Sequence, residues 1–418
     1  MYESLKNACK TFSEQLELSS SVKFVVEKNA EAVIAAALLS QLCVQKSVNF
    51  SLSFFTNLEK TLLEIEKDPS KLIFFIGNKL TIPEEKIKKP FFILTKESAL
   101  HHHTLSFPCP LPLSAYVLAK MINQKAEPVL ALLAFVKEGN PPEELLTDLS
   151  KRIEITSGIL VGSAAQPLQK MLGYCANPFL PGISGSEDGC FSFLREMGIS
   201  YKENGRFKSW TDLSQQEQQR LSEGLQLRGI SKRTVFLLKE EDSELKDLSF
   251  WYETIEACIT FGNPSLAVSL CLYPKKFKQK ALEVFLNIRR SLITSLEWCY
   301  LGFSSGQFPE KGNILLIPTT GHIPEHLAYD FVSIVLKWYT DTKIVFFIVP
   351  SVKGVLVLCG TKNNINIQSL VPALSSSGYK GRFEKNLLVF ELESEKEPLF
   401  CETVLTLGGK ILSEEIVR

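Results

Sequence analysis

A strand that turns directly into an apolar helix, at residues 22–45, constrains the fold of this chain more than any other stretch. Residues 22–26 are β-branched, aromatic or long, and Glu27, Lys28 and Asn29 form a polar elbow behind them. From Ala30 to residue 45 the chain contains no Gly or Pro and is apolar on nearly every side. Such a helix is typical of a crossover buried on a parallel sheet. Ligands of these sheets bind beyond the carboxyl ends of the strands, so a site is expected at the elbow.

Strands and helices alternate again on both sides of a helical middle region. The pattern predicts strands at 48–55, 72–76 and 91–94 and helices at 58–65, 113–121, 128–136 and 143–149. Near the C-terminus it predicts strands at 313–317, 343–349, 354–359 and 387–392 and helices at 324–338 and 367–374. This alternation predicts an α/β fold whose N-terminal part is a doubly wound parallel sheet.

The middle of the chain reads differently. Residues 160–189 are rich in Gly, Pro and Ser, and a small helical insert follows them. The charged run at 238–248 is expected to be a solvated segment, and amphipathic helices are expected at 250–260, 264–272 and 278–299. We therefore predict three domains, over residues 1–190, 191–305 and 306–418.

Composition limits the classes of function that the chain can serve. Lys and Arg together number 46, as do Asp and Glu, so no overall field draws the protein to nucleic acid or to an anionic membrane. The 10 cysteines are scattered without a CxxC pair, which predicts reduced, buried thiols. The N-terminus has no signal-peptide pattern, and no stretch is apolar over the ~18 residues of a membrane span. We expect a cytoplasmic protein.

The strand–elbow–helix unit and several later segments resemble the archaeal RecJ-like members of the DHH phosphoesterase superfamily. The later segments, in the order expected for that family, are NPFLPGISGSEDG (177–189), FSFLREMGI (191–199), WTDLSQQEQQRLSEGL (210–225) and LKDLSFWYETIEACITFGNPSLAVSLCL (245–272). The resemblance covers most of the chain. It implies an N-terminal DHH-type sheet, a helical middle segment and a smaller C-terminal α/β DHH-associated domain.

Active members of this family hold two metal ions, usually manganese, with Asp and His side chains from four strand ends, and the ions activate water for attack on a phosphodiester. In this chain the resemblance places the ligand positions at Glu27, Asn29, Glu31, Phe75, Thr95, Lys96 and Glu97, and near Lys137. No position keeps the family's ligand. Two of the replacements are lysines, which would put cations where metals should lie. The resemblance therefore implies an inactivated phosphoesterase without a metal or other cofactor.

The C-terminal domain of the family carries a Gly-rich loop whose backbone amides approach a phosphate. The matching stretch here is 377–383, and it keeps two glycines but ends in Phe383 where the family has His. Its candidate contacts to a nucleic-acid backbone are Ser377, Gly378, Lys380, Gly381 and Arg382. An ordinary charged turn between a helix and a strand is the alternative.

Two histidine-rich stretches could be taken for metal-binding sites, but the residues around each of them argue against metal binding. Residues 101–103 are three consecutive His without a preceding Asp, which favours an exposed loop. His322, Glu325 and His326 match the HxxEH pattern of a zinc protease, which requires both His on an established helix. Pro324 instead marks a helix start, so His322 is expected to lie outside the helix.

A RecJ-like chain without its metal ligands resembles the non-catalytic relative that, in archaea and eukaryotes, binds MCM and GINS in the replicative CMG helicase. The resemblance thus implies an archaeal scaffold of the nucleoid-associated replisome that binds GINS and MCM and contacts single-stranded DNA weakly. Residues 250–290 and the edge of the first domain are candidate docking surfaces. Two alternatives stay open: an active, GINS-associated, single-strand-specific 5′–3′ DNA exonuclease with a remodelled metal site, and a regulator that binds a small phosphorylated ligand.

Overall fold

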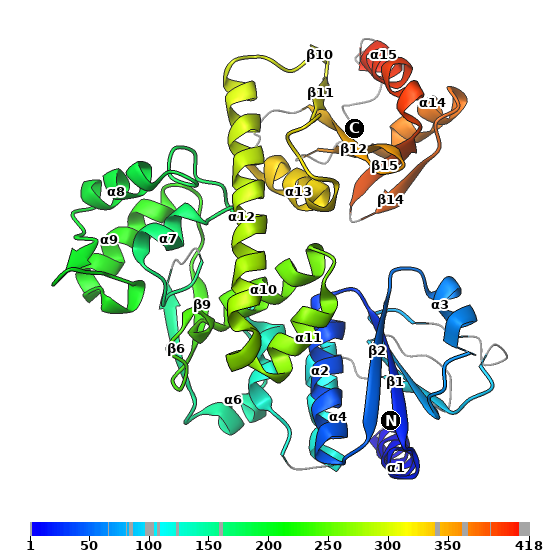
Figure 1. The fold of residues 1–418 in the computed structure, drawn as a ribbon. Coiled ribbons are helices and arrows are strands. Elements are labelled where there is room, and N and C mark those ends of the chain that lie inside the picture. The colour runs from blue at the N-terminus through cyan, green and yellow to red at the C-terminus, as the bar shows by residue number, and fades with distance from the viewer. Residues whose placement is uncertain are drawn as a thin grey trace. The chain divides into compact units, whose positions relative to one another are not determined.

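The computed structural model describes residues 2–65, 67–80, 82, 87–96, 104–106, 109–122, 125–158, 162–338, 343–361, 367–384 and 386–408 (Figure 1). Contacts divide the chain into two compact units. Unit 1 comprises residues 1–166, 209–214 and 231–285, and unit 2 comprises residues 167–208, 215–230 and 286–418. The three domain boundaries proposed from the sequence stay a prediction, because these units follow spatial contacts rather than continuous stretches of chain.

Unit 1 is built on a five-stranded parallel sheet. Its strand order is β2 (Asn49–Phe55), β1 (Ser21–Glu27), β3 (Leu72–Ile76), β4 (Phe91–Thr95) and β5 (Thr104–Ser106). Every residue of β3 and of β4 is buried, as expected for central strands covered on both faces. The predicted parallel sheet and its first four strands are confirmed. The short strand β5 was not anticipated.

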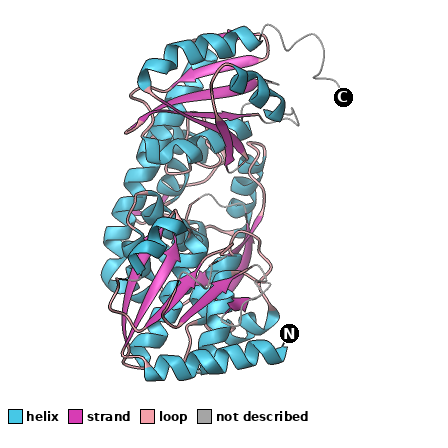
Figure 2. Cartoon of the chain, turned by 90° about the vertical axis from the view of Figure 1, so that its right-hand side faces the viewer, coloured by secondary structure: helices cyan, strands magenta, loops and turns pink. Residues whose placement is uncertain are grey.

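Helices cover both faces of this sheet (Figure 2). Neighbouring residues of a strand point to opposite faces, so Phe74 and Phe75 in β3 pack on different layers. Phe74 meets Phe12 of α1 (Tyr2–Leu18), with ring centroids 4.9 Å apart. Phe75 belongs to the cluster on the other face, which includes Leu62 and Ile65 of α3 (Leu58–Ile65). The two apolar layers explain why these strands read as continuous apolar runs.

The crossover helix α2 (Ala30–Gln45) begins at a side-chain cap. Asn29 has an extended backbone, and its Oδ1 accepts a hydrogen bond from the backbone N–H of Ala32 at 2.8 Å. The helix contacts β1 and, away from the sheet, α4 (Leu111–Ile122) and α11 (Pro264–Leu272). Because it is enclosed by these elements, its residues are buried on nearly every side. The predicted buried crossover is confirmed.

The rest of unit 1 consists of short helices and a ribbon of two strands. These elements are α5 (Pro128–Leu132), η2 (Leu133–Phe135), α6 (Glu143–Leu149), β6 (Ile153–Gly158), η3 (Trp210–Asp212), β9 (Arg233–Leu238), η4 (Glu244–Lys246), α10 (Leu248–Thr260) and the first part of α12 (Pro274–Ser304). Strands β6 and β9 pair antiparallel although a long stretch of chain separates them. The sequence pattern missed both strands, since their pairing is non-local.

One acidic residue in the charged run 238–248 is fully buried, which corrects the prediction of a solvated segment. Asp247, which is 0% exposed, caps α10 and accepts hydrogen bonds from the backbone N–H of Ser249 at 2.9 Å and of Ala164 at 3.1 Å. Arg233 lies 3.5 Å from the same carboxylate and also donates to the carbonyl of Gly162 at 3.0 Å. Burial raises the pKa of Asp247 above its usual range. Asp247 thus joins β9, α10 and the 162–164 loop.

The first part of unit 2 is the small helical insert that the sequence predicts. It contains α7 (Leu168–Gly173), α8 (Glu187–Glu196), the hairpin of β7 (Lys202–Glu203) and β8 (Arg206–Phe207), and α9 (Gln215–Gln226). Ser186 caps α8 by accepting the backbone N–H of Gly189 at 3.0 Å. A Cβ added at Gly189 would lie 1.8 Å from the carbonyl oxygen of Gly182. Only glycine at 189 permits the loop to approach the helix so closely.

The C-terminal part of unit 2 is a six-stranded mixed sheet with helices. The order is β10 (Glu310–Lys311), β11 (Ile314–Pro318), β12 (Ile344–Ser351), β13 (Gly354–Gly360), β15 (Leu387–Leu392) and β14 (Gly381–Glu384). Strands β11 and β12 are parallel, and the other described pairs are antiparallel. Its helices are η5 (Glu325–Leu327), α13 (Ala328–Trp338), η6 (Ile367–Ser369), α14 (Leu370–Ser376), η7 (Ser394–Lys396) and α15 (Glu397–Gly408). The smaller α/β unit is confirmed.

Two further observations concern the described residues of both units. Across the described residues, no helix has both the length and the apolar character needed to cross a lipid bilayer. The ten cysteines are free, and all except the partly buried Cys109 and Cys401 are buried. Burial raises the pKa of Cys43 and of Cys258 to about 12, which keeps these thiols protonated and unreactive at neutral pH.

Candidate functional site

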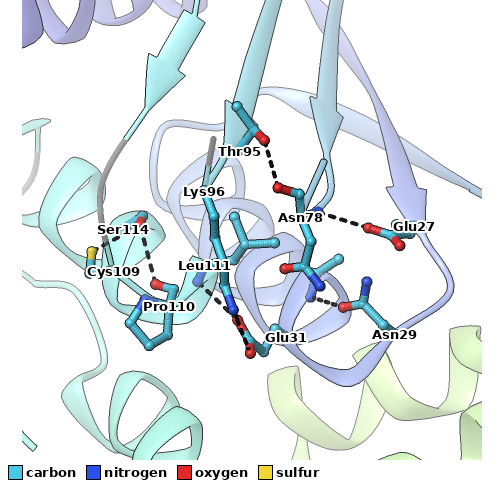
Figure 3. Close-up of polar contacts among 11 residues, drawn as sticks. Glu27, Asn29, Glu31, Asn78, Thr95, Lys96, Cys109, Pro110, Leu111 and Ser114 are labelled. Carbon is cyan, nitrogen blue, oxygen red and sulfur yellow. Dashed lines mark hydrogen bonds and ion pairs between the residues drawn. The ribbon is translucent and has the colours of Figure 1, made fainter. Parts of the chain in front are cut away.

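Three strand ends of unit 1 lie side by side at the predicted position of the site. Strand β1 pairs with β3, and β3 pairs with β4, all in parallel, so their carboxyl ends meet at one edge of the sheet. Figure 3 shows the side chains that follow these ends. The sheet therefore brings together Glu27, Asn29 and Glu31 after β1 with Thr95 and Lys96 at the end of β4.

The loop after β3 is held by both neighbouring strands through Asn78, a residue that the sequence analysis did not single out. The carboxylate of Glu27 accepts the backbone N–H of Asn78 at 2.8 Å, and the buried hydroxyl of Thr95 donates to its carbonyl oxygen at 2.9 Å. A Cβ added at Gly77 would lie 2.8 Å from Oε2 of Glu27. The sequence feature that could have drawn attention to Asn78 is the pair Gly77 and Asn78 directly after an apolar strand.

Glu31 and Lys96 form an ion pair across this edge (Figure 3). The ammonium Nζ of Lys96 lies 2.8 Å from Oε1 and 2.7 Å from Oε2 of Glu31, so it engages both carboxylate oxygens. The backbone N–H of Leu111, the first residue of α4, also donates to Oε2 at 3.3 Å. The Lys96 and Glu31 side chains are 35% and 24% exposed. This pair joins the starts of α2 and α4 to the end of β4.

Two amide groups at the same edge keep one atom each without a hydrogen-bond partner among the described residues. Asn29 uses its Oδ1 to cap α2, and its Nδ2 is buried. Asn78 uses its backbone groups as described above, and its Oδ1 is buried. One is a donor and the other an acceptor, so both are neutral groups beside the charged Glu27, Glu31 and Lys96.

Phe75 and Lys137 do not join this group, and Glu97 lies outside the described residues. Phe75 is 0% exposed, and its ring packs edge-on against Phe91 with centroids 6.2 Å apart. Lys137 pairs with Glu256 of α10 at 2.7 Å and lies over the ring of Tyr252 at 4.7 Å. Among the described positions, Phe75 and Lys137 thus make their contacts with residues other than Glu27, Glu31, Thr95 and Lys96.

The donor set at this edge does not fit a two-metal centre. Within the described ranges, no three His, Cys, Asp or Glu side chains are grouped so that they could hold a metal ion. A hydrolytic pair of hard cations needs several carboxylate or imidazole ligands. Here one carboxylate, Glu31, already binds an ammonium, and another, Glu27, accepts a backbone N–H. The histidines at 101–103 lie outside the described residues.

The candidate nucleic-acid loop of unit 2 is partly a strand. Gly381 and Arg382 belong to β14 at the edge of the sheet, which the sequence analysis had read as a loop. Gly378 has a φ of +88°, and both Ser377 and Lys380 are exposed. Arg382 lies 2.7 Å from Glu391 and 3.4 Å from Glu384, so acidic side chains already oppose its charge. Phosphate binding by this loop stays a prediction.

The HxxEH stretch is arranged as expected for a helix start. His322 precedes η5, and its ring stacks on Trp298 with centroids 4.1 Å apart. Glu325 accepts the backbone N–H of Val352 at 2.9 Å. His322 therefore lies outside the helix, as the position of Pro324 predicts.

Comparisons with known proteins agree with this fold. Residues 160–239 match the model of the DHH-CID domain family. The structure is similar to CDC45 from Entamoeba histolytica, with a TM-score of 0.63 and 12% identity over 97% of each chain. It is also similar to an exonuclease RecJ bound to manganese, with a TM-score of 0.57 and 10% identity over 99% of this chain and 97% of that one. RecJ from Thermus thermophilus, in complex with Mn²⁺, has a TM-score of 0.52 and 12% identity over 97% of this chain and 55% of that one.

No curated protein is similar enough in sequence to count as a relative of this chain. The structural similarities, at 10–12% identity, concern the fold. They extend over nearly the whole chain, and the DHH-CID match falls on the segment between the parallel sheet and α10. The chain therefore has a RecJ-like DHH fold with a DHH-CID domain, and in this fold it resembles CDC45.

Proposed function

We propose that this protein is a non-catalytic, RecJ-like DNA replication factor that binds GINS and MCM as a scaffold in the archaeal replicative helicase, the CMG complex. Two findings support the proposal: the fold is similar to that of CDC45, and the residues at the strand ends do not fit a two-metal centre. The balance of 46 basic and 46 acidic residues suits a protein-binding scaffold, with at most weak contact to single-stranded DNA.

The ion pair between Lys96 and Glu31 is the observation on which the loss of catalysis rests. A metal ion at this edge would have to compete with an ammonium that already contacts both oxygens of the carboxylate. Phe75, at another ligand position of the family, offers no lone pair and is packed in the core. Restoring a hydrolytic centre would thus require removal of a cation as well as the addition of ligands.

Two exposed aromatic residues, one before α11 and one after it, support the predicted docking region at 250–290. Phe261 follows the end of α10 and is 53% exposed, and Tyr273 follows the end of α11 and is 52% exposed. Aromatic side chains are enriched among the residues that dominate binding at protein interfaces. We therefore propose that Phe261 or Tyr273 contacts GINS.

Size-exclusion chromatography of the purified protein with recombinant GINS, and separately with MCM, tests the scaffold. We expect stable complexes that elute earlier than either component. A Phe261→Asp variant should lose the complex with GINS. A Leu63→Asp variant is the matched control, because Leu63 is an exposed apolar residue on α3, also in unit 1. Failure of the unchanged protein to bind either partner would refute the scaffold.

A nuclease assay on labelled single-stranded DNA with Mn²⁺ tests the absence of catalysis, with an active RecJ as positive control. We expect no release of mononucleotides. The competing function, a GINS-associated 5′–3′ exonuclease, predicts release that is lost in Glu27→Ala or Glu31→Ala variants. Activity with that dependence would contradict the proposal, and these carboxylates would then be ligands of a remodelled metal site.

A further inference from the structure

We infer that Lys96 is a built-in counterion that takes over, within the protein, the structural role that bound cations would have at this edge of the sheet. The inference deepens the proposed loss of catalysis and does not depend on GINS or MCM binding. It concerns the contacts of Glu31, at the start of α2. This carboxylate binds Lys96 at the end of β4 and accepts the backbone N–H of Leu111 at the start of α4.

The geometry indicates a counterion rather than an incidental surface contact. An exposed pair of long side chains usually forms one contact and is worth little. Here the Lys96 ammonium contacts both oxygens of Glu31, at 2.8 and 2.7 Å, and both side chains are more than half buried. Lys96 directly follows Thr95, whose hydroxyl is bonded to the neighbouring loop, so its backbone is held in place. Little conformational freedom remains for the pair to lose.

Partial burial, rather than its place in the first turn of α2, explains why Glu31 gains from a cation. Its carboxylate lies in the first turn of α2, where the helix dipole favours a negative charge, and accepts one backbone N–H. Partial burial removes part of its hydration, and removal of the cation would leave that loss uncompensated. In a metal-binding relative such a carboxylate would be neutralised by a divalent ion. In this chain the ammonium is covalently attached, so neutralisation requires no ligand from solution.

The first consequence is that stability is independent of divalent cations. Anything that binds the folded state alone raises the melting temperature with its concentration. The unmodified protein should therefore melt at the same temperature in MnCl₂ and in EDTA. A Lys96→Met variant leaves the Glu31 carboxylate without its cation, and we expect MnCl₂ to raise the melting temperature of this variant.

A double-mutant cycle tests the pairing itself. Lys96→Met, Glu31→Gln and the double variant are compared by urea unfolding with the unchanged protein. We expect a coupling of about five-fold in the unfolding equilibrium, with the double variant more stable than the sum of the single changes predicts. Lys10→Met is the matched control, because Lys10 pairs with Glu14 at 3.9 Å on an exposed helix face. MnCl₂ should not change the melting temperature of this control, and its free energy of unfolding should be close to that of the unchanged protein.

Two results would overturn the inference. One is additivity of Lys96→Met and Glu31→Gln. The other is a melting temperature of the unchanged protein that rises with MnCl₂ as much as that of Lys96→Met, which would show that Lys96 does not replace a cation. If Lys96→Met alone does not fold, a folded double variant supports the inference and an unfolded one refutes it. Because no partner protein is present, failure of the scaffold proposal would leave these results unaffected.

Discussion

Replacement of Asp247 by Ala tests whether this buried carboxylate ties β9 and the 162–164 loop to α10 within unit 1. Arg233 lies within residues 160–239, and Ala164 lies near the other end of the same segment. Both contact Asp247, which also caps α10. A single side chain thus joins β9 and the 162–164 loop to α10, and its removal should destabilise unit 1 rather than only a local helix end.

The magnitude follows from the groups that would lose a partner. Truncation leaves the backbone N–H groups of Ala164 and Ser249 without an acceptor, at about 1–3 kcal/mol for each group that stays buried. It also removes the carboxylate opposite Arg233, whose side chain is 25% exposed and can regain some hydration. The lower end of this range for two N–H groups gives about 2 kcal/mol, and with about 1 kcal/mol for the lost contact to Arg233 we expect a loss of about 3 kcal/mol in the free energy of unfolding. Asp247→Asn keeps an acceptor and avoids burying a charge, so it should cost about 1 kcal/mol.

Urea unfolding followed by tryptophan fluorescence provides the measurement, since Trp251 in α10 is buried close to the site of the change. Asp242→Ala is the control in the same charged run, because Asp242 is exposed, and it should change the free energy of unfolding by about 0.5 kcal/mol or less. Equal effects of Asp247→Ala and Asp242→Ala would refute the assignment of Asp247 as a structural link. The assignment would also be refuted if Asp247→Asn lowered the free energy of unfolding as much as Asp247→Ala does.

Three further predictions concern other parts of the chain. Gly189→Ala should destabilise unit 2 strongly, whereas Gly173→Ala, whose Cβ would lie 3.6 Å from its nearest neighbour, should be nearly neutral in thermal unfolding. Burial raises the pKa of Asp68, but hydrogen bonds, chiefly from Lys23, outweigh this and lower it to about 2. The free energy of unfolding should therefore fall by about 2 kcal/mol as pH falls from about 4 to about 2. In a Lys23→Met variant, urea unfolding over the same pH range should show a smaller fall, because the pKa of Asp68 is then lowered less. Phe75→Asp should unfold the protein, at a cost above about 3 kcal/mol, and restore no nuclease activity; a folded, Mn²⁺-dependent nuclease would contradict this.

The strands and helices that the sequence predicted are those with strong local signals. Residues 22–45, for example, combine a β-branched run, a polar elbow and an uninterrupted apolar helix, and the structure confirms the strand and the helix and shows that Asn29 caps the helix. Strands β6 and β9 were missed because each depends on a partner distant in sequence, and β14 was missed because it is a short strand at the edge of the sheet. The charged run at 238–248 was misread for a related reason, since Arg233 and the 162–164 loop supply the burial of Asp247.

The sequence by itself determined the parallel sheet, the elbow at the end of its first strand and the chemical identity of the groups there. These follow from residue type and spacing, which act over a few residues. Only the tertiary structure decided what those groups contact: Lys96 meets Glu31 across 65 residues of chain, and Phe75 turns into the core with α3. The physical reason is that a charged or polar side chain takes its role from the partner that the fold brings to it, and the parallel strand order sets that partner.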